Sequence, residues 1–221
     1  MTHLKVYAQI SFNLTYTFCV LNFYLKGVSP LSKVLVDLDG VLVDFLSSLK
    51  SYLNKSDKDL IIENITRYNF KGDIGCERAD VFEAMRRFEV FRNAGYYDGA
   101  LSSLERLQDV SDTYGYTLIP SNLFIMGHRT KQLFDLGLSG EPLLANKDGR
   151  KGVVSGDWDA VFDDSIEVLQ DWLDVPNVKL FLIDHTYNRE VNYPECSSVF
   201  KRVIRCKDFN EAVDKYINLM C

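Results

Sequence analysis

The feature that most constrains the fold is a short apolar segment ending in two closely spaced carboxylates, residues 34–44 (VLVDLDGVLVD). Its apolar start is typical of a strand buried on both faces of a parallel sheet. Asp37 and Asp39 follow directly, and Gly40 indicates a sharp turn or a close backbone approach. Asp44 then has the position of an N-cap. We therefore expect a buried strand, a turn and a helix, in that order.

Acids at the carboxyl end of a buried strand need a cation or hydrogen bonds to compensate them. Open α/β sheets bind their ligands at this edge, and side chains two residues apart on a strand point the same way. Asp37 and Asp39 can therefore serve one site. A Mg²⁺ ion, bound by carboxylates and phosphate oxygens, would balance their charge. The alternative is a plain turn or a fragment of a calcium loop, but residues 41–43 supply none of the further acids that an EF-hand needs.

The run from Asp37 to Val41 (DLDGV) resembles motif I of the haloacid dehalogenase (HAD) superfamily of phosphotransferases. Ser121, after the apolar strand candidate 116–119, is similar to the hydroxyl residue of motif II. Pro120 departs from the Thr-Ser that nucleotidases have in this region, which leaves the register open by one residue. A turn without a catalytic role is the alternative for this segment.

A lysine and a second acidic pair follow in the order that the superfamily requires. Lys151 precedes Val-Val-Ser and resembles the Lys-x-Val-Val-Ser stretch of the deoxyribonucleotidases; Lys147 and a merely solvated lysine are the alternatives. The apolar segment 160–162 ends in Asp163 and Asp164 and resembles motif IV, whose acids complete a Mg²⁺ site. Asp pairs alone are common at helix N-termini. Two strand-ending pairs with a serine and a lysine between them are much more specific.

The resemblance covers about residues 32–205 and implies a role for each residue. Asp37 would be the nucleophile that forms an aspartyl-phosphate, and Asp39 the general acid and then base. Mg²⁺ would be held by Asp37, the Asp39 carbonyl and Asp164, with Asp163 adjacent. The remaining phosphate oxygens would be bound by Ser121 and Lys151.

Within the superfamily the chain is most similar to the 5'(3')-deoxyribonucleotidases. We therefore expect a Mg²⁺-dependent phosphomonoesterase, a 5'-nucleotidase that hydrolyses nucleoside monophosphates. Phe88, Phe91 and Tyr96 are candidates for stacking on the base, with core packing as the alternative for Phe88. Two other functions stay open: a HAD phosphatase for a small sugar or metabolite phosphate, and a non-catalytic HAD-fold binding module.

Alternating strand and helix patterns predict an α/β fold with a doubly wound parallel sheet. Residues 31–43 and 98–221 would form the HAD-like core, and the strand-free residues 44–97 a small helical cap inserted after the first core strand. Expected strands are 34–36, 116–119, 160–162, 178–183 and 198–204. Expected helices include one starting at Asp44, one opened by Asp80, one over 129–136 and one over 208–220 with an Asp208/Glu211 capping pair.

Residues 1–30 form an N-terminal extension of uncertain structure. Twenty uncharged residues between Lys5 and Lys26 have the length of a membrane span, but polar residues interrupt them. An extra strand or tail is favoured over membrane contact through residues 6–25; a stretch outside the functional protein is the third alternative.

The amino-acid composition limits the classes of partner that we expect this chain to bind. The chain has 221 residues and a net charge of −6, which argues against binding of a nucleic acid polymer. Its five cysteines are dispersed without zinc spacing, which favours a reducing compartment and a cytoplasmic location. The expected partner is a small phosphomonoester; the oligomeric state is not fixed, and a homodimer is among the alternatives.

Overall fold

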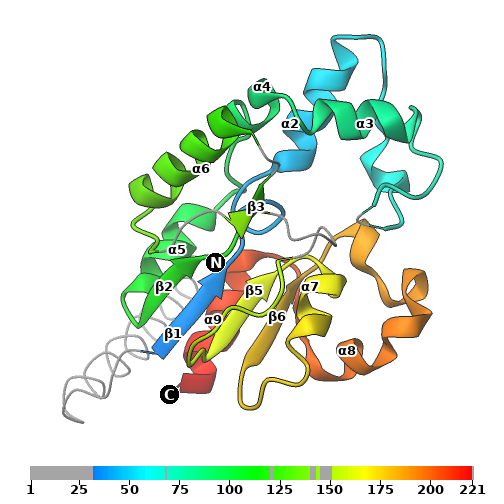
Figure 1. Cartoon of the computed structure of the whole chain (residues 1–221). Helices are drawn as coiled ribbons and strands as arrows, with labels where there is room; N and C mark the ends of the chain where they lie inside the picture. Colours follow the sequence, from blue (N-terminus) through cyan, green and yellow to red (C-terminus); the bar gives the residue numbers. More distant parts are fainter. Residues whose placement is uncertain (1–31, 68, 120–121, 140–142, 145–150, 221) are drawn as a thin grey trace, which may run out of the picture.

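The computed structural model describes residues 32–67, 69–119, 122–139, 143–144 and 151–220 (Figure 1). In this part of the chain, five parallel strands form one sheet in the order β2-β1-β5-β6-β7. The strands are β1 (Ser32–Val36), β2 (Ser111–Gly115), β5 (Ala160–Asp163), β6 (Lys179–Ile183) and β7 (Ile204–Cys206). A separate parallel pair is formed by β3 (Leu118–Ile119) and β4 (Leu143–Leu144).

Helices cover both faces of the sheet, as a doubly wound fold requires. Alternate residues of a strand face opposite sides, so Val34 and Val36 join one hydrophobic cluster and Leu35 the other. The first cluster includes α5 (Ala100–Gln108) and α9 (Phe209–Met220); the second includes α7 (Ile166–Asp171) and α8 (Ser197–Arg202). The predicted α/β fold with a doubly wound parallel sheet is therefore confirmed.

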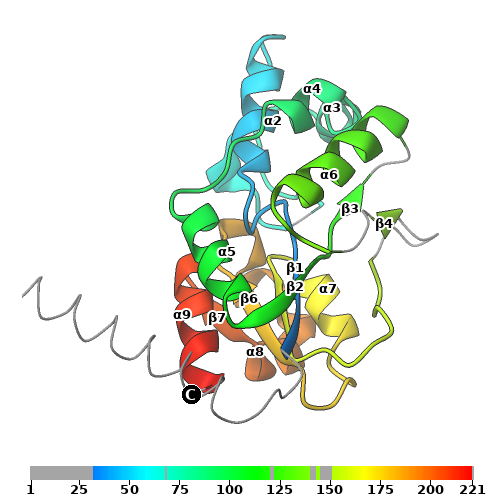
Figure 2. The ribbon, with the colours of Figure 1, turned by 90° about the vertical axis from the view of Figure 1, so that its left-hand side faces the viewer.

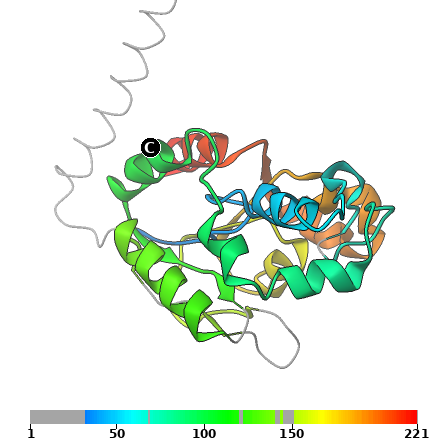
Figure 3. The same cartoon turned by 90° about the horizontal axis from the view of Figure 1, so that it is seen from above.

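A layer of helices lies beyond the carboxyl ends of the strands (Figures 1 and 2). Between β1 and α5 the chain forms α2 (Phe45–Asn54), the 3₁₀ turn η1 (Ile62–Asn64), α3 (Arg78–Ala84) and α4 (Phe88–Arg92). These elements share a third hydrophobic cluster, which also contains Ile125 of α6 (Leu123–Asp135). Seen from above, α6 runs beside the cap helices over the sheet (Figure 3). The helical cap after the first core strand is present, and α6 extends its layer.

The two connections between cap and sheet lie side by side. Val43 and Tyr96 form an antiparallel bridge, the Asp44 amide donates to the Gly95 carbonyl at 2.9 Å, and the Tyr97 amide donates to the Leu42 carbonyl at 2.9 Å. The Asp44 side chain accepts from the Ser47 amide, which confirms it as the N-cap of α2. The exact domain bounds, 44–97, stay a prediction.

The strand predicted over 116–119 is present only as β3 (Leu118–Ile119), which lies outside the five-stranded sheet. The strand beside β1 is β2, five residues earlier, with Gly115 in register with Val36. Its sequence SDTYG lacks an apolar run, because β2 is an edge strand whose buried hydroxyls are satisfied locally. Ser111 Oγ donates to the Leu107 carbonyl at 2.8 Å, for example.

Three further elements differ from the prediction. The strand expected over 198–204 is the helix α8 followed by β7, and the side chain of Arg202 anchors the end of α8 by donating to the Val175 carbonyl at 2.7 Å. The helix assigned to Asp80 begins at Arg78, and the Asp80 carboxylate accepts from Lys58 instead. Helix α6 begins well before residue 129, because the Asn122 side chain caps it. The Asp208/Glu211 capping pair is confirmed.

The predictions for residues 1–30, including membrane contact through residues 6–25, lie outside the described residues. Among the helices that the structure does describe, none is long and apolar enough to cross a bilayer. Among the described cysteines, Cys76, Cys196 and Cys206 form no disulfide bond.

Candidate active site

Two neighbouring strands bring the predicted acids together. β1 pairs with β5, with Val36 opposite Phe162, so the residues that follow both strands leave the sheet at the same edge. The Asp37 amide continues this ladder by donating to the Phe162 carbonyl at 3.0 Å. Asp37, Asp163 and Asp164 are all buried, and one carboxylate oxygen of each lies within 4.8 Å of the others.

Lys151 occupies the space between two of these acids. Its Nζ lies 2.8 Å from Asp37 Oδ1 and 2.8 Å from Asp163 Oδ2, and its side chain is only 6% exposed. The ammonium also lies 4.8 Å from the centre of the Tyr116 ring. Lys151 is thus at the position predicted for the phosphate-binding cation; the alternative, Lys147, lies outside the described residues.

The charges of this cluster do not balance within the protein. The three carboxylates carry three negative charges when ionised, and Lys151 supplies one positive charge, which leaves two negative charges in a buried site. One divalent cation would neutralise them. Asp164 Oδ1 is buried and has no hydrogen-bond partner among the described residues, as a vacant ligand atom would be. Clustered carboxylate oxygens are the donors that Mg²⁺ prefers, so the residues fit the ion.

The pKa values report the same imbalance. The net pKa of Asp37 is raised to about 7: burial is the largest cause, Lys151 opposes it, and the charges of Asp163 and Asp39 add to it. Burial and the neighbouring carboxylates hold the pKa of Asp164 well above its usual range. Burial lowers the pKa of Lys151, but Asp163 and Asp37 outweigh this and the net direction is upward, so the ammonium stays charged. A bound cation would favour the ionised acids.

Asp164 is fixed by residues that the sequence did not identify. The Tyr187 hydroxyl donates to Asp164 Oδ2, and Asn188 Nδ2 donates to the Asp164 carbonyl at 2.8 Å. Gly40 has φ of +81°, and a Cβ built on it would lie 2.3 Å from Asp164 Oδ2. His185 Nε2 lies 2.7 Å from the Gly40 carbonyl, and its ring stacks on Tyr187. Tyr187 and Asn188 follow the end of β6 closely, which is the sequence signal that could have identified them.

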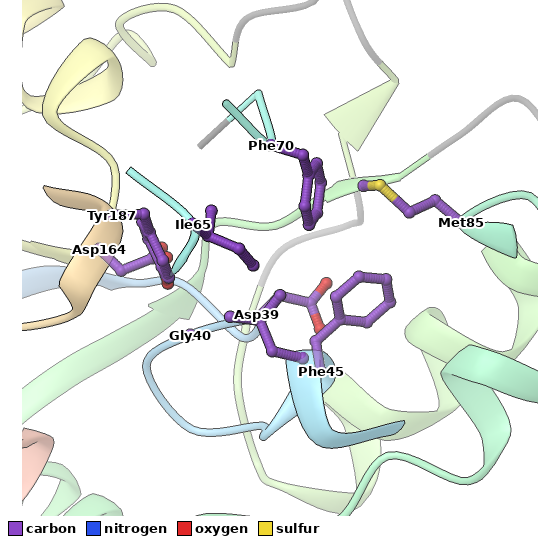
Figure 4. A pocket seen from close by; sticks show the side chains of 9 residues that line it. Asp39, Gly40, Phe45, Ile65, Phe70, Met85, Asp164 and Tyr187 are labelled. Atoms are coloured by element: carbon purple, nitrogen blue, oxygen red, sulfur yellow. The ribbon is translucent and has the colours of Figure 1, made fainter. Parts of the chain in front are cut away.

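Asp39 lies at the mouth of this cluster and faces the cap. Its carboxylate pairs with Arg129 of α6, and it lines a pocket together with Asp164 and Tyr187. The rest of the lining is the Gly40 backbone and apolar side chains of the cap: Phe45, Leu46, Ile65, Phe70 and Met85. Figure 4 shows Phe45, Ile65, Phe70 and Met85 around Asp39. The cavity measures about 30 Å³, which is room for water but not for a phosphomonoester.

The aromatic residues predicted to stack on a base do not line this pocket. Phe91 is buried, with its ring 5.1 Å from Phe45 and under the Arg129 guanidinium at 5.0 Å. Phe88 packs against Phe124 and His128 of α6. Tyr96 is 38% exposed and accepts a hydrogen bond from Gln132 at 3.2 Å. Phe45 and Phe70 are the rings that lie beside the acids.

The structure does not test the hydroxyl residue that was predicted for this site. Ser121 lies outside the described residues. Thr117 follows the carboxyl end of β2, directly after Tyr116, whose amide donates to the Val36 carbonyl at 2.8 Å. Its Oγ1 is buried and has no partner among the described residues. Thr117 is therefore a second candidate for the phosphate-binding hydroxyl, alongside Ser121.

No model of a protein family matches this sequence, and no curated protein matches it. Solved structures do share its fold. A haloacid dehalogenase-like family hydrolase from Streptococcus pneumoniae is similar over 84% of this chain and 98% of its own, with a TM-score of 0.56 and 12% identity.

Two further structures give the same result. A haloacid dehalogenase-like protein of unknown function from Agrobacterium tumefaciens matches 86% of this chain and 99% of its own, with a TM-score of 0.54 and 12% identity. A protein from Oleispira antarctica described as phosphonoacetaldehyde hydrolase-like matches 87% of this chain and 93% of its own, with a TM-score of 0.51 and 11% identity. The chain therefore has the fold of the HAD-like hydrolases.

Proposed function

We propose that this protein is a Mg²⁺-dependent phosphomonoesterase of the HAD type, and that nucleoside monophosphates are its substrates. The observation that carries the proposal is the convergence of Asp37, Lys151, Asp163 and Asp164 at the ends of β1 and β5. Asp39 lies beside them and lines a pocket that faces the cap. The fold shared with HAD-like hydrolases agrees with this chemistry.

The residues divide the reaction into two displacements. Asp37 attacks phosphorus, and the bond to the leaving alcohol breaks while Asp39 gives its proton to the departing oxygen. Water then attacks the aspartyl-phosphate, Asp39 takes a proton from it, and inorganic phosphate leaves with Asp37 restored. Lys151 and the Thr117 hydroxyl stabilise the negative phosphoryl oxygens in both steps.

Asp37, Asp164 and Asp163 are the residues that would hold Mg²⁺. When bound, the ion supplies charge neutralisation between the acids and the phosphate. The unpartnered Oδ1 of Asp164 supports this ligand set, since it is a buried acceptor with capacity to spare. Tyr187 and Asn188 orient Asp164 from behind.

The character of the pocket supports a substrate with a flat or apolar leaving group. Among the described residues, its polar side chains are Asp39, Asp164 and Tyr187, all of which lie at the phosphate end. The leaving group would meet Phe45, Phe70 and Met85, which suit a base better than the hydroxyls of a sugar phosphate. A sugar or metabolite phosphate is the second candidate, and the same assay separates the two.

A panel of phosphomonoesters assayed with and without Mg²⁺ tests the proposal. We expect Mg²⁺-dependent phosphate release with nucleoside monophosphates preferred over sugar phosphates, and loss of activity in Asp37→Asn. Asp112→Asn, an exposed acid on the edge strand β2, is the matched control and keeps full activity. Equal turnover of sugar phosphates would remove the nucleotide assignment. Activity that survives in Asp37→Asn would remove the nucleophile.

A further inference from the structure

Arg129 is an unusual residue for the interior of this protein. It lies on α6, outside the four segments that supply the acids, the lysine and the threonine, yet its side chain is fully buried. The guanidinium donates to Asp39 through one terminal nitrogen and to Gln132 through the other. Its Cζ atom lies 5.0 Å from the centre of the Phe91 ring of the cap helix α4.

This arrangement is poorly suited to stabilising the fold. Arg129 Nε is buried and has no hydrogen-bond partner among the described residues. A buried charge with an unsatisfied N–H costs stability, and an apolar residue of similar volume often serves a core as well or better. A function for the buried guanidinium therefore has to be sought in the group it contacts.

That group is the carboxylate proposed to move the proton. Asp39 follows the end of β1 in a turn, and its side chain is 17% exposed toward the pocket. The other acids are held by Lys151, Tyr187 and backbone amides, whereas within the described residues the Asp39 carboxylate pairs with Arg129. Without this contact the Asp39 side chain would be free to take other rotamers.

Arg129 also connects Asp39 with the cap. The ring of Phe91 supports the guanidinium from α4, and Gln132, one turn further along α6, donates to the Tyr96 hydroxyl at the return from cap to core. The views from the side and from above place α6 next to α4 (Figures 1 and 3). The Arg129–Asp39 ion pair therefore lies where α6, the cap helix α4 and the turn after β1 meet.

We propose that Arg129 is a positioning residue that holds the Asp39 carboxylate in the orientation needed to protonate the leaving group. This inference rests on the proposed phosphomonoesterase function. It adds a residue from outside the motif segments and assigns it one step, the proton transfer at the leaving oxygen. Displacement of a catalytic group by about 1 Å costs about 100-fold in rate.

The test compares two substrates that differ in their need for a proton. p-Nitrophenyl phosphate releases a stable anion, whereas a nucleoside monophosphate releases an alcohol that must be protonated. In Arg129→Met we expect turnover of the nucleoside monophosphate to fall about 100-fold, and that of p-nitrophenyl phosphate to change by less than about threefold. Arg129→Lys should give an intermediate ratio, because an ammonium keeps the charge without the planar fork.

A double-mutant cycle with Asp39→Asn separates positioning from general damage. If Arg129 acts through Asp39, then Arg129→Met causes no further loss in the Asp39→Asn background. The control is Arg92→Met, which removes an arginine stacked on the neighbouring Phe88 ring but touches no site acid; both activities should persist. If Arg129→Met does not fold, the substrate ratio of Arg129→Lys decides.

The outcomes distinguish this inference from the proposed function. An equal loss on both substrates, or a further loss in the Asp39→Asn background, would overturn the positioning role while leaving the phosphatase intact. A wild-type protein inactive on both substrates with Mg²⁺ would instead overturn the proposed function, and the role of Arg129 with it.

Discussion

Replacement of Lys151 by methionine tests the charge balance of the site. The substitution keeps the aliphatic stem and removes the ammonium that lies 2.8 Å from both Asp37 and Asp163. In the part of the chain that the structure describes, no side-chain cation then lies between the three buried carboxylates. Breaking a buried ion pair costs about 3–5 kcal/mol, because the remaining charge stays desolvated. For a protein of this size the melting temperature should fall by about 6–20 °C.

The pH dependence of this loss has a definite sign. Burial already raises the pKa of Asp37 and Asp164 above their unfolded values, and removal of Lys151 raises both further. The folded state then binds more protons than the unfolded state between about pH 4 and pH 7 or above, so its stability falls as the pH rises through that window. The loss of stability caused by Lys151→Met should be small at about pH 5 and complete at about pH 8.

Thermal unfolding at both pH values, with and without millimolar MgCl₂, measures this effect. Mg²⁺ should restore part of the loss at the higher pH, because the ion binds the native carboxylates and supplies the missing charge. Lys131→Met, which removes an exposed pair with Asp135, is the control and should change stability by less than about 1 kcal/mol. A melting temperature for Lys151→Met that equals the wild-type value at high pH without Mg²⁺ would refute the reasoning.

Three further changes probe single contacts. Gly40→Ala should lower stability by about 1–2 kcal/mol, because the backbone there is left-handed, and weaken Mg²⁺ binding, because the new Cβ displaces Asp164. The control is Gly99→Ala, which has the same backbone strain but open space around the new Cβ. It should leave the Mg²⁺ affinity measured by calorimetry unchanged. Thr117→Val should reduce phosphatase kcat by about 10–100-fold at nearly unchanged melting temperature, since Oγ1 has no partner in the described structure; a normal kcat would exclude it as a phosphate donor. Calorimetric Mg²⁺ affinity should fall as the pH drops below about 7, since protons compete for Asp37; an affinity independent of pH would argue against this ligand.

The acidic part of the site was predictable because both acidic pairs follow strongly apolar strands. Apolar runs before Asp37 and Asp163 identify buried parallel strands, and such strands end at a common edge of the sheet. Asp37 and Asp163 lie close together in the structure because of that rule and because β1 pairs with β5. Lys151 was predictable through its resemblance to a known stretch rather than through the periodicity of its surroundings.

The remainder of the site was hidden by local sequence effects. β2 is an edge strand with polar residues, so its sequence does not look like a buried strand, and Thr117 beyond its end was not considered beside Ser121 as a hydroxyl donor. Arg129 was missed because a lone arginine on a helix normally faces solvent. Only tertiary packing against Phe91 and Asp39 shows that it is buried. Substrate contacts were harder still, since the pocket is lined by Phe45 and Phe70 rather than by the aromatic residues of α4.

The nucleotide assignment depends on parts of the cap that no strand register fixes. Phe45 lies at the start of α2 and Phe70 in the irregular segment before α3, so their approach to Asp39 results from cap packing alone.

A crystal structure of the protein with Mg²⁺ and trifluoroberyllate, a mimic of a phosphoryl group bonded to a carboxylate, tests the central claim most directly. The account predicts that the beryllium is bonded to Asp37, with Lys151 on its fluorine atoms and the metal ion on the Asp164 carboxylate. An anion bonded to another residue, or a metal ion bound away from Asp37 and Asp164, would contradict it.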